Sequence, residues 1–171
     1  WWTCASSAAS RAAEYARPER ARLTATPVTI GHRRSLTPIQ RALFASQQRD
    51  PRSPMQNMVH LCHIESQIDP DRLAASFASV VAASDVLRTQ ITTNADGETT
   101  VRLSNEPATT EVVSVPRDDA HAWARRRARH AIAIGRQAYD SVILVHEDGT
   151  VSWYLALHHC VPDAVSTTLV F

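Results

Sequence analysis

Two strand-like runs near the end of the chain, joined by a four-residue turn, constrain the fold most. Residues 141–146 and 151–157 are rich in apolar and β-branched side chains, which favour β-strands. Residues 147–150 include a glycine, which supplies the backbone freedom that a hairpin turn needs. We therefore expect an antiparallel hairpin here, with Trp153 in the core and Tyr154 at the rim of its second strand.

A second hairpin and several helices precede this pair. Residues 87–92 and 99–103 are strand-like, and a turn-forming cluster around Gly97 separates them. Apolar periodicity and capping residues predict further elements. These are helices at 38–48, at about 70–84, at about 118–132 and from Asp163 onward, and strands at 58–64 and 110–115. Helices and strands do not alternate strictly, so the chain is predicted to have an α+β fold.

The basic residues are all arginines, 18 in number, and 17 acidic residues leave a net charge of +1. Without lysine, the chain can form neither a Schiff base nor the lysine contact of a phosphate-binding P-loop. Four scattered glycines exclude a glycine-rich dinucleotide-binding turn. No run approaches the roughly 18 apolar residues of a membrane helix. We expect a cytoplasmic protein that binds neither nucleic acid nor membranes.

The chain divides into two regions by composition. Residues 1–34 are rich in Ala, Ser, Arg and Pro without sustained periodicity, so we expect a disordered leader or linker. Residues 35–171 are predicted to form one domain. The three cysteines are too few and too scattered for a disulfide framework, which predicts free thiols. The chain begins without methionine and stops within an apolar run, so we expect that this domain is truncated.

Two adjacent histidines at the end of the last predicted strand are the densest chemical feature. Successive side chains of a strand point to opposite faces, so only one of His158 and His159 can face a cleft while the other faces the interior. Asp163 follows four residues after His159 and can either cap the final helix or pair with a buried arginine. Taken alone, such a pair is more often a packed, hydrogen-bonded structural feature than a site.

Three other features have simple structural interpretations. Cys160 lies beside His159 as in thiol–imidazole pairs, but neighbours on a strand point apart, which argues against a cysteine nucleophile. Residues 60–63 hold two histidines and a cysteine whose spacing matches no zinc-binding pattern, so no metal site is expected. The arginine cluster at 125–129 is expected to be a solvated helix face, with protein docking as the second interpretation.

Three motifs in fixed order carry a resemblance to a known family. They are Ser35-Leu36-Thr37-Pro38-Ile39-Gln40-Arg41-Ala42-Leu43, Asp85-Val86-Leu87-Arg88-Thr89, and His158-His159 through Asp163 and Ser166. Over residues 35–171 the sequence resembles the N-terminal half of a nonribosomal peptide synthetase condensation domain, of the chloramphenicol-acetyltransferase-like superfamily. The resemblance implies that the chain folds as the N-terminal lobe of this superfamily, which is a mixed sheet flanked by helices. It also implies that the second lobe is missing.

The resemblance also implies roles for individual residues. His159 matches the second histidine of the HHxxxDG motif and is the catalytic histidine, while His158 and Asp163 support it in the same motif. Arg88 is expected to form a buried structural ion pair with Asp163 that holds the histidine loop. In such domains the amine of an acceptor aminoacyl thioester attacks a donor acyl thioester, and a neutral imidazole accepts or positions the amine proton.

The implied partners are donor and acceptor carrier proteins, an adenylation domain and the missing C-terminal lobe. The substrates travel on the phosphopantetheine arms of the carriers, so the domain itself is expected to bind no cofactor. The sequence departs from the family at Ala164, where a glycine is usual, and at Ser84 and Asp85, where an arginine-histidine-glutamate run is common. These departures indicate a divergent subclass with an altered fit to substrate.

Two alternatives remain open from the sequence. The first is an acyl-CoA-dependent O- or N-acyltransferase of the same superfamily. The second is a noncatalytic docking lobe or a pseudogene fragment, which would account for the truncation. We expect the chain to be inactive in isolation.

Overall fold

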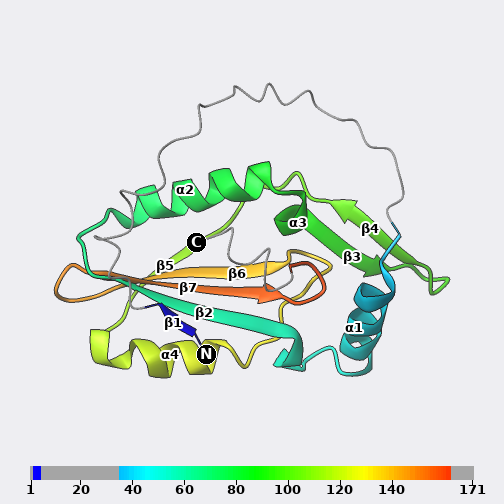
Figure 1. Cartoon of the computed structure of the whole chain (residues 1–171), viewed down its shortest axis with the longest axis horizontal. Coiled ribbons are helices and arrows are strands. Elements are labelled where there is room, and N and C mark those ends of the chain that lie inside the picture. Colours follow the sequence, from blue (N-terminus) through cyan, green and yellow to red (C-terminus); the bar gives the residue numbers. More distant parts are fainter. Residues whose placement is uncertain (1, 5–34, 163–171) are drawn as a thin grey trace, which may run out of the picture.

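The computed structural model describes residues 2–4 and 35–162 of the chain, and a five-stranded mixed sheet is its centre (Figure 1). The strands, in the order in which they lie in the sheet, are β1 (Trp2–Cys4), β2 (Asn57–Ile64), β7 (Val151–His158), β6 (Tyr139–Val145) and β5 (Glu111–Ser114). The central pairs β2–β7 and β7–β6 are antiparallel. The outer strand β1 is parallel to β2, and the outer strand β5 is parallel to β6. The predicted α+β fold with a mixed sheet is confirmed.

Four α-helices and two single-turn 3-10 helices accompany the strands in the described ranges. The α-helices are α1 (Pro38–Arg49), α2 (Pro70–Ala83), α3 (Asp85–Arg88) and α4 (Ala120–Arg127), and the 3-10 helices are η1 (Pro54–Gln56) and η2 (Arg117–Asp119). Thr37 and Asp69 cap α1 and α2, each with a proline in the first turn, which explains why both begin where predicted. None of these helices is long and apolar enough to cross a membrane.

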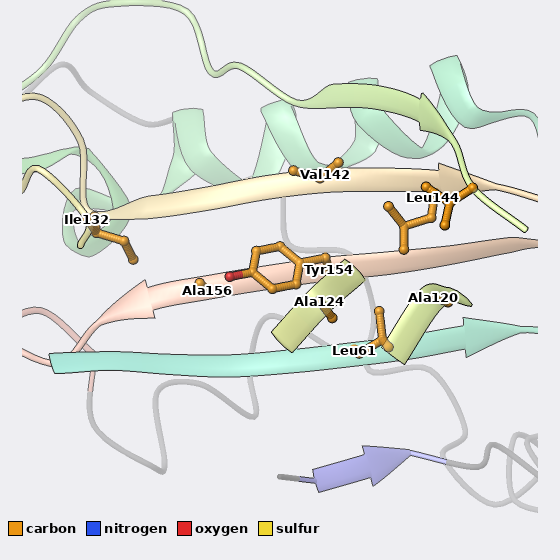
Figure 2. Packing of buried hydrophobic residues seen from close by; sticks show 9 residues of the cluster. Leu61, Ala120, Ala124, Ile132, Val142, Leu144, Tyr154 and Ala156 are labelled. Carbon is orange, nitrogen blue, oxygen red and sulfur yellow. The ribbon is translucent and has the colours of Figure 1, made fainter. Parts of the chain in front are cut away.

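Helices α2 and α4 cover opposite faces of the sheet (Figure 1). On the α4 face, Leu61, Tyr154 and Ala124 belong to one buried cluster, which Figure 2 shows between the helix and the strands. On the α2 face, the ring of Phe77 makes edge contacts with the ring of Trp153 at a centroid distance of 5.3 Å. Trp153 and Tyr154 are therefore both buried, and the expected core-and-rim difference is wrong because helices cover both faces of β7.

A third apolar cluster joins α1 to the end of β7. Phe44 of α1 packs with Ile91 of β3, with Ile134 from the loop before β6, and with Cys160 just beyond β7. This cluster places α1 beside the turn that follows the two histidines. The sequence motif at 35–43 and the histidine motif are thus neighbours in space.

The predicted hairpin at 87–103 is confirmed as β3 (Thr89–Thr93) and β4 (Thr99–Leu103), but the first two residues of the predicted strand, 87 and 88, lie in the short helix α3 instead. The Ser84 hydroxyl accepts the Leu87 N–H, and Asp85 pairs with Arg88 one turn later. These local bonds satisfy a helical turn. Leu87 is buried in that turn and not along a strand.

Helix α4 ends at Arg127, five residues before the predicted end at 132. Asn57 Nδ2 donates to the carbonyl oxygens of Ala128 and His130, at 3.3 and 2.7 Å, and these bonds hold the chain after the helix against β2. Ile132 and Ile134 then enter two different apolar clusters, which a continuous helix would not allow. Tertiary packing therefore overrides the helical pattern.

Two expectations concern the ends of the chain. The structure places Trp2–Cys4 in strand β1, parallel to β2, although we predicted no regular structure there. The remaining leader, residues 1 and 5–34, and the terminal helix predicted from Asp163 lie outside the described residues.

Candidate active site

The candidate site lies where β7 ends and the chain turns. His158 is the last residue of β7, and its carbonyl accepts the Val161 N–H at 3.0 Å to close the turn. The His159 N–H donates to the Gln56 carbonyl at 2.8 Å, which anchors the turn to the start of β2. The backbone that carries both histidines is therefore fixed by the two central strands.

His158 is fully buried. It continues the face of β7 to which Tyr154 and Ala156 belong, on the α4 side. Its Nδ1 accepts the Cys160 N–H at 3.2 Å, so the neutral ring carries its proton on Nε2. Burial, and then the neighbouring His159, lower the pKa of His158 to about 4. The ring is thus neutral near pH 7 and acts as a structural support of the turn.

His159 is exposed, as expected of one member of the pair. Its Nδ1 lies 3.4 Å from the Pro162 carbonyl, a long contact. A carbonyl only accepts, so in this contact Nδ1 carries the proton and Nε2 keeps a free lone pair. That lone pair can accept a proton from a substrate, which is the chemistry of a general base. The predicted division into one buried and one outward-facing histidine is confirmed.

Gln40 is a supporting residue whose role the sequence motif did not reveal. Its Nε2 donates to the Cys160 carbonyl at 3.0 Å, while its Oε1 and backbone N–H complete a capping box with Thr37. One side chain therefore joins the first turn of α1 to the turn after His159. The Thr37-x-x-Gln40 capping box was readable in the sequence, but the long-range bond to Cys160 was not.

Cys160 does not have the environment of a nucleophile. Its side chain is buried, and burial raises the pKa of the thiol to about 11. Reactive cysteines have lowered pKa values and partly exposed thiols. The structure agrees with the sequence argument against a thiol–imidazole pair.

Arg88, at the end of α3, pairs with Asp85 at 2.8 Å between Nη2 and Oδ1. Its Nε is buried and makes no hydrogen bond in the part of the chain that the structure describes. Asp163 lies outside the described residues, so the Arg88–Asp163 ion pair stays a prediction. The unpaired Nε leaves one buried donor of Arg88 available for it.

The arginine cluster divides into two environments. Arg125, Arg126 and Arg129 are exposed, as a solvated face requires. Arg127 instead makes a two-pronged contact with Asp140, at 2.8 and 2.9 Å. It also approaches Glu111 at 3.1 Å. A cavity of about 550 Å³ is lined by Arg127 and Asp140, among others, and His159 does not line it.

Within residues 2–4 and 35–162, no three His, Cys, Asp or Glu side chains gather in a way that could hold a metal ion. Cys160 is a free thiol.

Comparisons with known proteins identify the fold. The condensation domain family model matches residues 31–171. No curated protein sequence matches this chain significantly. The starter condensation domain of rhizomide synthetase is similar over 81% of this chain, with a TM-score of 0.73 and 23% identity, and the match covers 35% of that chain. A structure of an arginine-to-alanine variant of that domain in complex with C8-CoA matches 81% of this chain, with a TM-score of 0.72 and 24% identity. The match covers 33% of that chain.

The first condensation domain of the calcium-dependent antibiotic synthetase, in complex with a substrate analogue, matches 81% of this chain with a TM-score of 0.72 and 21% identity. The match covers 35% of that chain, so the present chain spans about a third of the solved structures it resembles. These likenesses agree with the lobe expected from the sequence. Because the family model covers most of the sequence, the chain belongs to the condensation domain family.

Proposed function

We propose that this chain supplies the histidine-bearing lobe of an acyl-transfer site that forms amide bonds between carrier-bound acyl groups. The observation that supports this most is the position of His159. Its imidazole is exposed at the end of the central strand, while its backbone is held by Gln56. A base on a rigid element is well placed to act on a bound substrate.

In the proposed reaction, the amine of an acceptor aminoacyl thioester attacks the carbonyl carbon of a donor acyl thioester. The new C–N bond forms as the C–S bond breaks. The amine proton passes to Nε2 of His159, and the donor arm leaves as a thiolate that takes up a proton. General-base assistance of this kind contributes about 10² to 10⁴ in rate, and holding both tethered substrates together supplies much of the rest.

The neighbouring residues position the base. The buried ring of His158 accepts the Cys160 N–H, and the side chain of Gln40 donates to the Cys160 carbonyl. These two bonds hold the residue that follows His159. We include the Arg88–Asp163 ion pair in the proposal, because Arg88 keeps a buried donor without a partner among the described residues. Its role is structural and involves no contact with substrate.

The partners follow from the same proposal. Donor and acceptor carrier proteins deliver the substrates on phosphopantetheine arms, an adenylation domain loads the carriers, and the lobe binds no cofactor of its own. Since the chain spans about a third of each matched structure, we propose that activity needs a second lobe and that the chain alone forms no product.

The test is a chimera in which residues 31–171 replace the matching segment of the first condensation domain of the calcium-dependent antibiotic synthetase. Loaded donor and acceptor carriers are added, and the condensed thioester is measured by mass spectrometry. His159→Ala is expected to lower the rate by about 10² to 10⁴, whereas His130→Ala, which removes an exposed histidine elsewhere, leaves it unchanged. Full activity in the His159→Ala chimera would refute the proposal.

Two alternatives give different results in the same assay. One matched structure is a complex with C8-CoA, which favours testing an acyl-CoA donor beside the carrier-bound one. Faster transfer from acyl-CoA to a free amine or alcohol would assign the chain to the CoA-dependent acyltransferases. A folded chimera that yields no product with His159 intact would support the noncatalytic docking lobe.

A further inference from the structure

A chain of hydrogen bonds at the opposite end of β7 links three histidines and a serine. His146 Nδ1 lies 2.8 Å from the Val115 carbonyl, and its Nε2 lies 2.6 Å from Ser152 Oγ. Ser152 Oγ is 2.7 Å from His63 Nδ1, and His63 Nε2 is 3.3 Å from His121 Nε2. Ser152 is at the start of β7, so this chain is remote from His159, which follows the end of the strand.

The carbonyl at the buried end sets the direction of every bond. A carbonyl only accepts, so His146 Nδ1 carries the proton and His146 Nε2 must accept from the Ser152 hydroxyl. The Ser152 oxygen in turn accepts from His63 Nδ1–H. The neutral ring of His63 therefore holds its lone pair on Nε2, directed at His121.

This arrangement is the one that metal-binding histidines use. Such a histidine donates its second ring N–H to a fixed acceptor, which orients the ring and sets its tautomer. Ser152 is fully buried and His146 is nearly so, so the acceptor for His63 is rigid. His121 is exposed on α4, and its Nε2 is the nitrogen that lies against His63.

The distance between the two outer nitrogens also fits a shared metal ion. Two Zn–N bonds of about 2.0–2.1 Å at a tetrahedral angle hold their nitrogens about 3.3–3.4 Å apart. The observed Nε2–Nε2 distance is 3.3 Å. Without metal, the two rings share the proton on His121 Nε2. With metal, that proton is lost to solvent, and the exposed ring takes one up on Nδ1.

The charges around the pair leave room for a cation. Desolvation by burial, and then His121, Arg117 and His146, lower the pKa of His63. Of the three residues that lower this pKa, Arg117 is the one with a permanent positive charge. Its guanidinium is bound to Asp148 at 3.2 Å, which partly compensates that charge.

We propose that His63 and His121 form a binding site for one divalent transition-metal ion of the zinc class, with Ser152 and His146 orienting His63. The described residues supply two protein ligands, and water completes the coordination. The site joins β2 to α4 and is independent of the proposed acyl transfer.

The test uses the full chain, treated with chelator and free of any histidine tag, titrated with ZnCl₂ by calorimetry. One Zn²⁺ per chain is expected. His121→Ala removes an exposed ligand and should abolish binding, whereas His130→Ala, a matched exposed histidine beyond α4, should bind like the unchanged chain. Ser152→Ala should weaken the affinity by about 10- to 100-fold. Circular dichroism confirms that each variant is folded.

Two results would overturn the proposal. One is the absence of saturable Zn²⁺ binding by the unchanged chain, and the other is unchanged binding by His121→Ala. Electron paramagnetic resonance of the Cu²⁺-loaded chain gives an independent readout, because two coordinated imidazoles split the signal with two nitrogens. Loss of the two-nitrogen splitting in His121→Ala is expected, and a spectrum of the unchanged chain without nitrogen coupling would contradict the assignment.

Discussion

His158 and His159 are adjacent in sequence but have opposite environments, and this difference gives each its chemistry. The ring of His158 is enclosed on the α4 side and accepts a backbone N–H, so its charged form is disfavoured. The ring of His159 lies in solvent beyond the strand, and its outer nitrogen is free to accept a proton. One residue stabilises the turn, and the other is available to a substrate.

The buried ring should make stability depend on pH. The pKa of His158 is lowered from 6.5 to about 4 in the folded chain, so between these values the unfolded chain binds more protons. The full stabilisation is therefore present above pH 6.5 and is lost as pH falls toward 4. The free energy of unfolding should decrease by about 3 kcal/mol over this window because of this residue.

Urea unfolding at several pH values measures the effect. His158→Asn keeps an acceptor near the position of Nδ1 but does not titrate, so its unfolding free energy should vary less with pH by about 3 kcal/mol. His60 and His63 also have lowered pKa values, but they titrate in both proteins, and the comparison removes their contribution. Equal pH dependence in the two proteins would show that folding does not lower the pKa of His158.

Helix α1 and the turn after β7 act together at the scale of elements. Gln40 closes the capping box of α1 and donates to the Cys160 carbonyl, and Phe44, one turn further along, belongs to the same apolar cluster as Cys160. The short motif at the start of α1 thus helps to position the turn that follows His159. This contact gives a physical reason why the two motifs occur together.

Removing this contact should loosen the turn. Gln40→Ala removes a capping interaction and the hydrogen bond to the Cys160 carbonyl. We expect it to lower the unfolding free energy by about 1–2 kcal/mol. Hydrogen exchange at the Cys160 and Val161 amides should become faster. Gln48→Ala, in the same helix, breaks a bond to Thr93 instead and should leave those amides unchanged. Unchanged exchange in Gln40→Ala would refute the coupling.

Local signals predicted most of the elements but not their surroundings. The caps at Thr37 and Asp69 and the turn glycines Gly97 and Gly149, both with positive φ, act within a few residues and were therefore readable. The burial of Tyr154 depends on a helix that packs from elsewhere in the chain, so alternation along one strand could not predict it. The outward position of His159 followed from strand geometry, whereas its support by Gln56 required the pairing of β2 with β7.

At the scale of the molecule, β7 contributes side chains to the apolar clusters under both α2 and α4. Helix α4 is attached to the sheet at both of its ends. His121 meets His63 of β2 at the beginning of α4, and Arg127 meets Asp140 of β6 at its end. Arg127 also lies 5.8 Å from the centre of the Trp123 ring. The sequence suggested a solvated arginine face, because the acidic partners of Arg127 come from strands and not from the helix.

The attachment at Arg127 should contribute to stability more than its neighbours do. Arg127→Ala leaves the half-buried Asp140 carboxylate without its two-pronged partner, and we expect a loss of about 1–3 kcal/mol in unfolding free energy. Arg126→Ala, one residue away and exposed, should change it by less than about 0.5 kcal/mol. Asp140→Asn combined with Arg127→Ala completes a double-mutant cycle measured by urea unfolding. Additive losses would mean that the pair does not couple α4 to the sheet, whereas a smaller combined loss would show that it does.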